Sequence, residues 1–305
     1  CLANSGAEAN EGAIKIARLF GHHKGSAEPK IAVMTSSFHG RTLSALAATG
    51  NLKIQAGFAP LPTGFVRVPY GDLATLTALA QNDPSICAVL VEPIQGEGGI
   101  NLAPTGFLSG IRALCDSQNM LMMLDEIQTG IGRTGKMFAF QHYHFTPDVM
   151  SLAKGLGGGF PIGAIVARGA AAQCFTPGSH GSTFGGSPLA CRAALSVLET
   201  IEQEHLCENA SARGAQLLSE FKTALASTAG VVDIRGQGLM IGIQLQQPCT
   251  DLVDIAREAG VLINVTADCV VRLLPPLVLS AAEGSELVNR LSTIIHSWCA
   301  NRSHA

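Results

Sequence analysis

The sequence predicts an α/β fold in which helices cover both faces of a mostly parallel sheet. Two short apolar runs, residues 120–124 and 149–153, end at polar residues: the first at Asp125 and Glu126, the second at Lys154. Apolar runs without alternation are typical of parallel strands, because helices bury both faces of those strands. Ligands bind at the carboxyl ends of such strands. We therefore expect Asp125 and Lys154 to lie at the same edge of the sheet.

A lysine at the end of an apolar strand has two interpretations. It can be a surface residue that keeps its ammonium group in water. It can also be an amine that burial makes easier to deprotonate, so that it forms a Schiff base with an aldehyde. The glycine-rich turn after Lys154, residues 155–159, favours the second interpretation, because it lets a planar ligand approach the backbone. A pyridoxal phosphate enzyme also needs an acid that keeps the pyridine nitrogen protonated, and Asp125 would supply it.

Two motifs carry a resemblance to a known family. Residues 125–135 (DEIQTGIGRTG) and 152–164 (LAKGLGGGFPIGA) resemble the active-site core of the class III aminotransferases, which are pyridoxal 5′-phosphate enzymes of fold-type I. Within that class the chain is most similar to the acetylornithine aminotransferases. The similarity runs from SGAEAN at residues 5–10 to VVRLLPPL at residues 270–277. It implies that Lys154 and Asp125 are catalytic.

Composition and charge narrow the function classes. With 305 residues, 47% of them hydrophobic, the chain can bury a large core. The net charge of −3 and the lack of a basic run argue against nucleic acid or an anionic membrane as a partner. No apolar run approaches the length of a membrane span. Nine cysteines without a CxxC pair predict a reduced, cytoplasmic protein with no metal site.

The resemblance implies two domains. We expect a large cofactor-binding domain over residues 1–205 and a smaller α+β domain over residues 206–305. The chain starts with Cys1 rather than Met and runs directly into a functional motif. Family members carry a further segment before this point, so we expect the chain to be incomplete at its N-terminus.

The N-terminal motif predicts an anion site. Residues 1–4 are read as the end of a strand, and Ser5, with Glu8 three residues later, matches a capping box that opens a helix. A strand, a turn of small residues and a helix N-terminus together can bind an anion, although an ordinary capped helix has the same pattern. The resemblance assigns the cofactor phosphate to Ser5, Gly6 and Ala7.

The next predicted strand, residues 31–34, leads to an aromatic and a basic residue. By themselves these would be read as a core side chain and a solvated one. The resemblance implies that Phe38 stacks on the pyridine ring and that Arg41 binds the substrate carboxylate distant from the reacting amine. A guanidinium suits that task because its planar fork binds a carboxylate with two hydrogen bonds. His39 is expected either to pack or to contact the ring. Residues 51–70 are expected to form a loop.

A helix over residues 72–81 and a strand over 87–91 are predicted next, followed by two carboxylates. Glu92 and Glu97 can both belong to a solvated loop. The resemblance implies instead that Glu92 orients the network around the cofactor. It also implies that Glu97 pairs with a distant arginine when the amino donor is not a dicarboxylate.

After the predicted helix 107–118 and Asp125, the resemblance implies that Ile127 packs on the pyridine ring opposite Phe38. Gln128 is expected to hydrogen-bond the ring hydroxyl. For Arg133 a structural role is favoured. The spacing of His142 and His144 would place both on one face of a strand, but they lack a third ligand and are interpreted as packing residues.

The remaining segments complete the prediction. In the family, residues corresponding to Ser182 and Thr183 reach the cofactor phosphate of a second subunit, so the resemblance implies a homodimer. Arg272 lies in an apolar run and needs an acidic partner, which the resemblance identifies as Glu97. The expected helices and strands are helices 188–202, 209–225, 252–259 and 283–300 and strands 231–235, 240–245 and 270–274.

The resemblance implies transfer of the δ-amino group of N-acetylornithine to 2-oxoglutarate, a step of arginine biosynthesis, through a Schiff base of Lys154. Succinylornithine, ornithine, 4-aminobutyrate or succinyl-diaminopimelate are alternative amino donors. An alternative of another class is a truncated chain that keeps the cofactor-binding fold but has no turnover.

Overall fold

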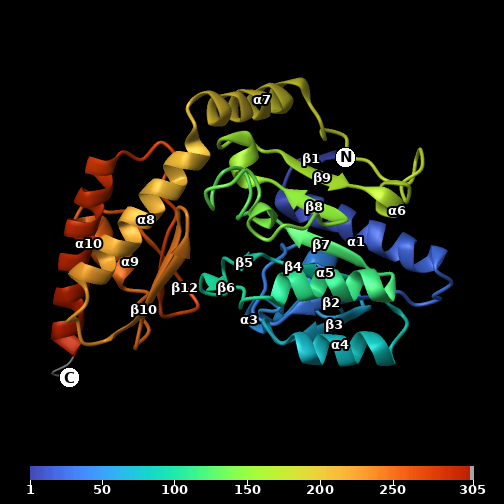
Figure 1. The fold of residues 1–305 in the computed structure, drawn as a ribbon, viewed down its shortest axis with the longest axis horizontal. Helices are drawn as coiled ribbons and strands as arrows, with labels where there is room; N and C mark the ends of the chain where they lie inside the picture. Colours follow the sequence, from blue (N-terminus) through green and yellow to red (C-terminus); the bar gives the residue numbers. More distant parts are fainter. Residues whose placement is uncertain (303–305) are drawn as a thin grey trace. The chain divides into compact units, whose positions relative to one another are not determined.

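The computed structural model describes residues 1–302 (Figure 1). The chain divides into two compact units, and each is described by itself. The first unit comprises residues 1–96, 103–131 and 138–199, and the second comprises residues 97–102, 132–137 and 200 onward. Two short internal segments, 97–102 and 132–137, therefore belong with the C-terminal part of the chain.

The first unit is built on a mostly parallel sheet of seven strands, which confirms the predicted fold class. The strand order is β1-β9-β8-β7-β4-β2-β3. Neighbours from β8 to β3 are parallel, whereas β9 is antiparallel to both β8 and β1. The strands are β1 (Leu2–Ala3), β2 (Lys30–Met34), β3 (Phe65–Val68), β4 (Ile86–Val91), β7 (Leu121–Asp125), β8 (Val149–Leu152) and β9 (Gly163–Ala167).

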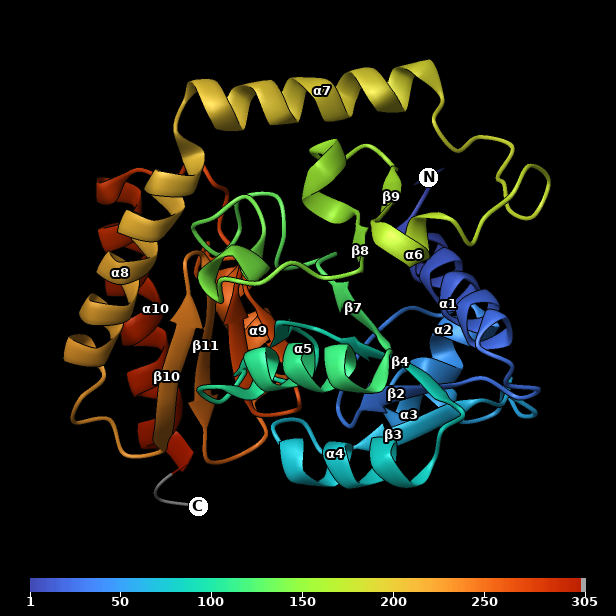
Figure 2. The ribbon, with the colours of Figure 1, turned by 45° about the vertical axis from the view of Figure 1, so that its right-hand side comes forward.

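Helices cover both faces of this sheet, as Figures 1 and 2 show. On one face α1 (Gly6–His23) buries an apolar stripe that includes Ala13, Ile16 and Phe20, at the spacing of an amphipathic helix. On the other face α4 (Leu73–Asn82) and α5 (Phe107–Gln118) pack with the opposite side chains of the strands. The other helices are α2 (Leu43–Ala48), α3 (Leu52–Gln55), α6 (Gly169–Ala172), α7 (Pro188–Gln203) and the 3₁₀ helices η1 (Ala139–His142) and η2 (Lys154–Gly157).

The topology brings the carboxyl ends of six strands, β3 among them, to one edge of the sheet. Strands β2, β4, β7 and β8 are parallel, so their carboxyl ends share an edge. Because β1 and β8 are both antiparallel to β9, β1 is parallel to β8 and ends there as well. The residues that follow these ends include Ser5, Phe38, Glu92, Ile127 and Lys154. The expected common edge of Asp125 and Lys154 is confirmed, since Asp125 lies opposite Ser151 in the register of β7 and β8.

The second unit is an antiparallel sheet with helices packed on it. Its strand order is β10-β11-β13-β12, and its main core contains side chains of α8 and α10 and one face of the sheet. Segment 97–102 covers the other face, where a Cβ on Gly242 would lie 3.0 Å from Ile100 Cβ. The elements are β10 (Val231–Gln237), β11 (Met240–Leu245), β12 (Asn264–Thr266), β13 (Val270–Leu273), α8 (Leu206–Ala224), α9 (Leu252–Glu258) and α10 (Ala281–Arg302). Strands β5 (Ile94–Gln95) and β6 (Asn101–Leu102) lie in the connection before α5.

One local expectation was wrong, and the condition set for a second pair of residues is not met. Residues 51–70 are not a loop throughout, because they form α3 and the edge strand β3, whose short apolar run is masked by the prolines and glycine before it. His142 and His144 do not share a strand, because His142 ends η1 and His144 has a φ of +57°. The sequence analysis also did not identify β9 and β12.

Candidate active site

Lys154 occupies an unusual backbone conformation at the end of β8. It is exposed and has a φ of +44°, in the left-handed region that residues with a Cβ rarely adopt. Gly158 and Gly159 in the following turn also have positive φ, of 58° and 110°. Backbone strain of this kind persists where the surrounding structure imposes it, and it is concentrated at functional sites. The structure therefore presents the lysine amine at the sheet edge through a specific local conformation.

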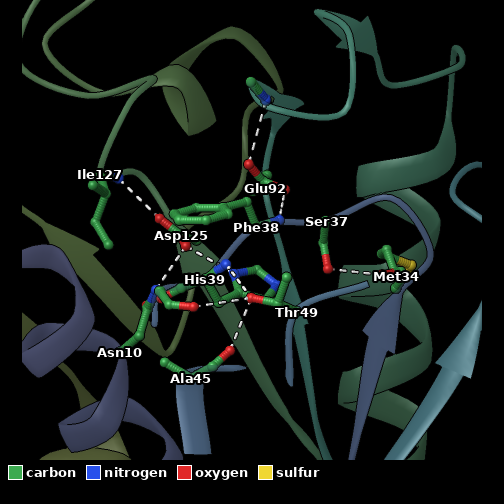
Figure 3. Close-up of polar contacts among 12 residues, drawn as sticks. Asn10, Met34, Ser37, Phe38, His39, Ala45, Thr49, Glu92, Asp125 and Ile127 are labelled. Atoms are coloured by element: carbon green, nitrogen blue, oxygen red, sulfur yellow. Dashed lines mark hydrogen bonds and ion pairs between the residues drawn. The ribbon is translucent and has the colours of Figure 1, made fainter. Parts of the chain in front are cut away.

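Asp125 is a buried carboxylate with three hydrogen-bond donors (Figure 3). Its Oδ1 accepts the backbone N–H of Ile127 at 3.1 Å, and its Oδ2 accepts Asn10 Nδ2 and His39 Nδ1, each at 2.8 Å. An ionised carboxylate only accepts hydrogen bonds, so His39 carries a proton on Nδ1. The donors come from α1, from the turn after β2 and from the turn after Asp125 itself. They fix the carboxylate in one orientation.

His39 is fully buried beside this carboxylate. Burial alone lowers its pKa, but the hydrogen bond and the charge of Asp125, with the charge of Glu92, outweigh burial and raise the pKa above its usual value. Its backbone N–H donates to Thr49 Oγ1 at 2.9 Å. Among the described residues, its Nε2 has no hydrogen-bond partner. The ring is thus held through Nδ1 and its backbone.

Glu92 is a second buried carboxyl group of the same edge. Its Oε2 accepts the N–H of Phe38 at 3.1 Å, and its Oε1 accepts the N–H of Gly96 at 3.3 Å. Burial raises its pKa to about 7; the charge of His39 opposes this shift and that of Asp125 adds to it. The group therefore exchanges its proton near neutral pH, and it ties the turn after β2 to the turn after β4.

Glu126, which follows Asp125 in the sequence, is held by hydrogen bonds from the protein itself and has a structural role. It is completely buried, and it accepts Thr129 Oγ1 at 2.8 Å and the N–H groups of Ala139 and Phe140 at 2.8 and 2.9 Å. Burial raises its pKa. It anchors the turn after Asp125 and thereby supports Ile127 and Gln128.

The expected phosphate site lies at the start of α1. Ser5 is the N-cap, and its Oγ accepts the N–H of Glu8 at 3.2 Å. The Glu8 side chain accepts both the N–H and Nδ2 of Asn4, at 2.9 and 2.7 Å. A Cβ on Gly6 would lie 2.9 Å from Ile127 side-chain atoms, so only glycine lets these two turns approach. Since the first N–H groups of a helix have no intrahelical acceptor, the N-terminus of α1, including Gly6 and Ala7, can bind an anion.

Phe38, Arg41 and Gln128 are also placed at this edge. Phe38 is half-buried, and the Arg41 guanidinium carbon lies 5.9 Å from the centre of its ring, on an exposed side chain. Gln128 packs closely against Gly96, where an added Cβ would meet Gln128 Oε1 at 2.2 Å. The half-buried ring of Phe38 and the exposed guanidinium of Arg41 therefore lie near the buried carboxyl groups.

Ser182 and Thr183 lie on an exposed segment before α7. Ser182 Oγ accepts Asn4 Nδ2 at 2.7 Å, which joins this segment to the residue before the α1 cap. Thr183 and Phe184 are exposed, Phe184 with 74% of its surface accessible. Ser182 and Thr183 therefore lie beside a large apolar side chain that is exposed to solvent, and exposed apolar surface can mark an interaction site.

In the second unit, the expected acidic partner of Arg272 is confirmed. Arg272 Nη1 lies 2.6 Å from Glu97 Oε1, and Nη2 donates to Asn264 Oδ1 at 2.9 Å. The two charged side chains differ in exposure, with 9% for arginine and 40% for glutamate. The arginine is the more enclosed partner and the glutamate the more accessible one.

Arg133 has structural contacts within the second unit. Its Nη1 donates to the carbonyls of Leu239, at 3.1 Å, and Pro275. Burial lowers its pKa to about 10. These contacts hold segment 132–137 against the second unit, which supports the structural interpretation.

Sequence reasoning missed Asn10, Thr49 and Asn264. Asn10 offered a signal, because it is a polar residue on the buried stripe of an otherwise apolar helix. Thr49 and Asn264 offered none, since their contacts depend on a turn and on a short edge strand that the sequence did not reveal. In the part of the chain described, no group of three metal-ligating side chains comes together, and no helix has the length and apolarity of a membrane span.

The residues present fit pyridoxal phosphate. A fixed buried carboxylate, an exposed lysine in a strained conformation and a helix N-terminus meet at one sheet edge, with a half-buried aromatic ring beside them. These are the groups needed for a protonated pyridine nitrogen, an aldehyde and a phosphate.

The comparisons with known proteins agree with this chemistry. The family described as Aminotransferase class-III matches residues 1–295. An acetylornithine aminotransferase from Nitrosomonas europaea is 56% identical over 297 residues, 97% of this chain and 75% of the relative. Another from Methanothermobacter thermautotrophicus is 46% identical over 294 residues, 96% and 74% of the two chains.

Solved structures give the same result. The ornithine aminotransferase of Toxoplasma gondii superposes with a TM-score of 0.93 at 35% identity, covering 97% of this chain and 72% of that chain. An (S)-enantioselective omega-transaminase from Thermomicrobium roseum gives 0.90 at 32% identity, with 97% and 74% covered. The chain therefore belongs to the class III aminotransferases, and it is a transaminase that depends on pyridoxal 5′-phosphate.

Proposed function

We propose that this aminotransferase moves the δ-amino group of N-acetylornithine to 2-oxoglutarate, giving glutamate and a semialdehyde, as a step of arginine biosynthesis in the cytoplasm. The similarity to acetylornithine aminotransferases over nearly the whole chain supports this donor. The observation that carries the substrate pair is the Arg272–Glu97 ion pair. An arginine that a glutamate can mask or release suits an enzyme that must accept both a dicarboxylate and an ω-amino acid.

The positions of the residues support the following roles. When bound, pyridoxal phosphate supplies an aldehyde that reacts with amines and a ring that withdraws electrons. Lys154 would hold the cofactor through Nζ. Once the amino group of the substrate has displaced Nζ, the free lysine amine would take the proton from the amine-bearing carbon of the substrate. Asp125 accepts the hydrogen bond of the protonated ring nitrogen. Because its other donors fix it, its negative charge stays in place throughout.

The remaining residues of the first unit hold the cofactor. Ser5, Gly6 and Ala7 bind the phosphate at the N-terminus of α1. The side chains that would contact or orient the ring are those of Phe38, His39, Glu92, Ile127 and Gln128.

Substrate carboxylates are recognised by arginines. Arg41, exposed beside Phe38, binds the carboxylate distant from the reacting amine. Arg272 binds the α-carboxylate of glutamate, and Glu97 neutralises Arg272 when N-acetylornithine is bound.

We further propose a homodimer in which Ser182 and Thr183 contact the cofactor phosphate of the partner subunit. Both lie on an exposed segment, and the neighbouring apolar side chains of Phe184, 74% exposed, and Leu189, 66% exposed, offer a surface that a second copy would cover. Sedimentation of the loaded protein tests this: a monomer at micromolar concentration contradicts it.

The test of the activity uses the absorbance of the bound cofactor. We expect the purified protein with bound pyridoxal phosphate to show an absorbance band near the edge of the visible range. The band should disappear when N-acetylornithine is added and return when 2-oxoglutarate is added. A Lys154→Ala variant should lose this response. A band that responds to glutamate but not to N-acetylornithine would point to another donor, such as ornithine, succinylornithine, 4-aminobutyrate or succinyl-diaminopimelate. No band with Lys154 intact would support the alternative of a fold without turnover.

A further inference from the structure

We propose that Asn264 is a positioning residue that holds the Arg272 guanidinium in place while Glu97 moves, and so sets the balance between the two substrates. This inference rests on the proposed function of the Arg272–Glu97 pair and deepens it. It assigns a role to β12, a strand that contains no residue of the expected site.

The two terminal nitrogen atoms of the Arg272 guanidinium bind different partners, Glu97 at Nη1 and Asn264 at Nη2. Asn264 on β12 lies directly opposite Arg272 on β13 in the antiparallel register. Directly opposite residues project from the same face of a sheet, so their side chains meet. Asn264 Oδ1 accepts Nη2 at 2.9 Å, while Glu97 accepts Nη1 at 2.6 Å. When Glu97 leaves, the hydrogen bond from Arg272 Nη2 to Asn264 Oδ1 remains.

The chemistry of the two partners is complementary. Glu97 neutralises the positive charge of Arg272, whereas the amide of Asn264 orients the guanidinium without neutralising it. Released from Glu97, Arg272 would present a full positive charge and an oriented Nη1 to a substrate carboxylate. A carboxylate at position 264 would remove that charge permanently.

The backbone around Glu97 is held by the same unit. Thr266 Oγ1 donates to the carbonyl of Glu97. Arg235 on β10 donates to the carbonyls of Gly99 and Ile100, at 2.6 and 2.9 Å. These bonds fix three backbone carbonyl groups of segment 97–102, those of Glu97, Gly99 and Ile100. A change of the ion pair therefore needs only rotation of the Glu97 side chain.

The exposed fractions of the two side chains agree with a fixed Arg272 and a movable Glu97. The Arg272 side chain is 9% exposed and is bound through both Nη1 and Nη2, while the Glu97 side chain is 40% exposed and accepts Arg272 Nη1 at 2.6 Å. The arginine is the fixed element and the glutamate is the movable one.

The experiment compares Asn264→Asp and Asn264→Ala in the loaded, full chain. Asn264→Asp is nearly isosteric but places a second carboxylate beside Nη2, so we expect the glutamate half-reaction to lose about tenfold in kcat/KM, mainly through KM. The N-acetylornithine half-reaction should change by less than about twofold, because Arg272 is already masked in that complex. Asn264→Ala should weaken glutamate in the same direction but less.

A binding measurement gives a second readout that does not depend on turnover. Glutarate, an unreactive dicarboxylate, should bind the Asn264→Asp enzyme about tenfold more weakly, as followed by calorimetry. Asn289→Asp is the matched control, because Asn289 is exposed on α10 and the same charge change there should leave both half-reactions unaltered.

The outcomes separate this inference from the function on which it rests. Equal loss in both half-reactions, or no loss for glutamate and glutarate in Asn264→Asp, would overturn the role of Asn264. A parent chain that responds to neither amino donor would instead overturn the proposed function, before any variant is compared.

Discussion

The carboxyl groups at the first unit's sheet edge and the ion pair of the second unit differ in how firmly each carboxylate is held. Asp125 is enclosed, with three donors that come from separate elements. Glu97 is 40% exposed and pairs with an arginine that also has a neutral partner. In a buried network every partner fixes the others, whereas the more exposed Glu97 carboxylate can turn toward water when a substrate carboxylate replaces it on the enclosed arginine. The first arrangement suits a charge that must stay in place, and the second suits a charge that must be masked and released.

The largest expected effect comes from breaking the fixed charge. Asp125→Asn keeps the shape but removes the negative charge that would hold the ring-nitrogen proton, so we expect both half-reactions to slow on the order of 10³-fold. Stopped-flow absorbance with each amino donor measures this. Asp254→Asn, in an exposed ion pair with Arg257, is the control and should have no effect. A loss confined to one donor would contradict the role of Asp125.

A smaller effect is expected from removing one of the hydrogen bonds that hold the Asp125 carboxylate in place. Asn10→Ala removes the donor that reaches both Asp125 Oδ2 and the His39 carbonyl, at 2.8 and 2.7 Å. Buried acceptors left unsatisfied should lower the free energy of unfolding by about 1–3 kcal/mol. Both half-reactions should slow together, because the carboxylate serves both. Urea unfolding and the two half-reaction rates check this, with Asn82→Ala on the exposed surface of α4 as the control. Unchanged stability would show that Asn10 does not support Asp125.

The movable pair should respond differently. Glu97→Gln removes the charge that masks Arg272, so the ratio of kcat/KM for glutamate to that for N-acetylornithine should rise about tenfold. The physical reason is that an unmasked guanidinium favours the substrate with a second carboxylate. Steady-state kinetics with each donor measures the ratio, and Glu286→Gln, exposed on α10, is the control. Parallel changes for both donors would contradict a masking role.

The fold and much of this contrast could be predicted from the sequence, for identifiable reasons. Strand ends at Asp125 and Lys154 were visible because continuous apolar runs stop there, and α1 was visible from its cap and its apolar stripe. That Arg272 needs an acidic partner followed from its place in an apolar run, and the family resemblance identified Glu97 as that partner. The hydrogen bonds from Asn10 to Asp125 and from the His39 backbone to Thr49 were not predicted, because both depend on how the turns close.

The second unit shows the same limit more strongly. Segments 97–102 and 132–137 join it across long sequence separations, and β12 is only three residues long on the edge of the sheet. Such a strand has too little pattern to identify. Asn264 therefore could not be singled out before its register with Arg272 was known.

The smallest expected effect concerns pH and tests the proton held in the first unit. Burial raises the pKa of Glu92 to about 7 in the fold, above the ordinary glutamate value of 4.5. The folded chain therefore binds this proton more tightly than the unfolded chain does. The stabilisation is fully present below the unfolded pKa, and it is lost as the pH rises through about 7. The raised pKa of His39 acts in the same direction, because its proton is also held more tightly in the fold.

Urea unfolding between about pH 5 and pH 8 tests this sign. The parent chain should lose about 2–3 kcal/mol more than Glu92→Gln over this interval, since the variant keeps a neutral side chain at every pH. Glu286→Gln on α10 should retain the slope of the parent. An equal slope in Glu92→Gln and the parent would show that Glu92 does not hold a proton in the folded chain. In that case the buried charge at this edge would be shared by Asp125 and Glu92, and the fixed network would have to tolerate two adjacent carboxylates with His39 as their common cation.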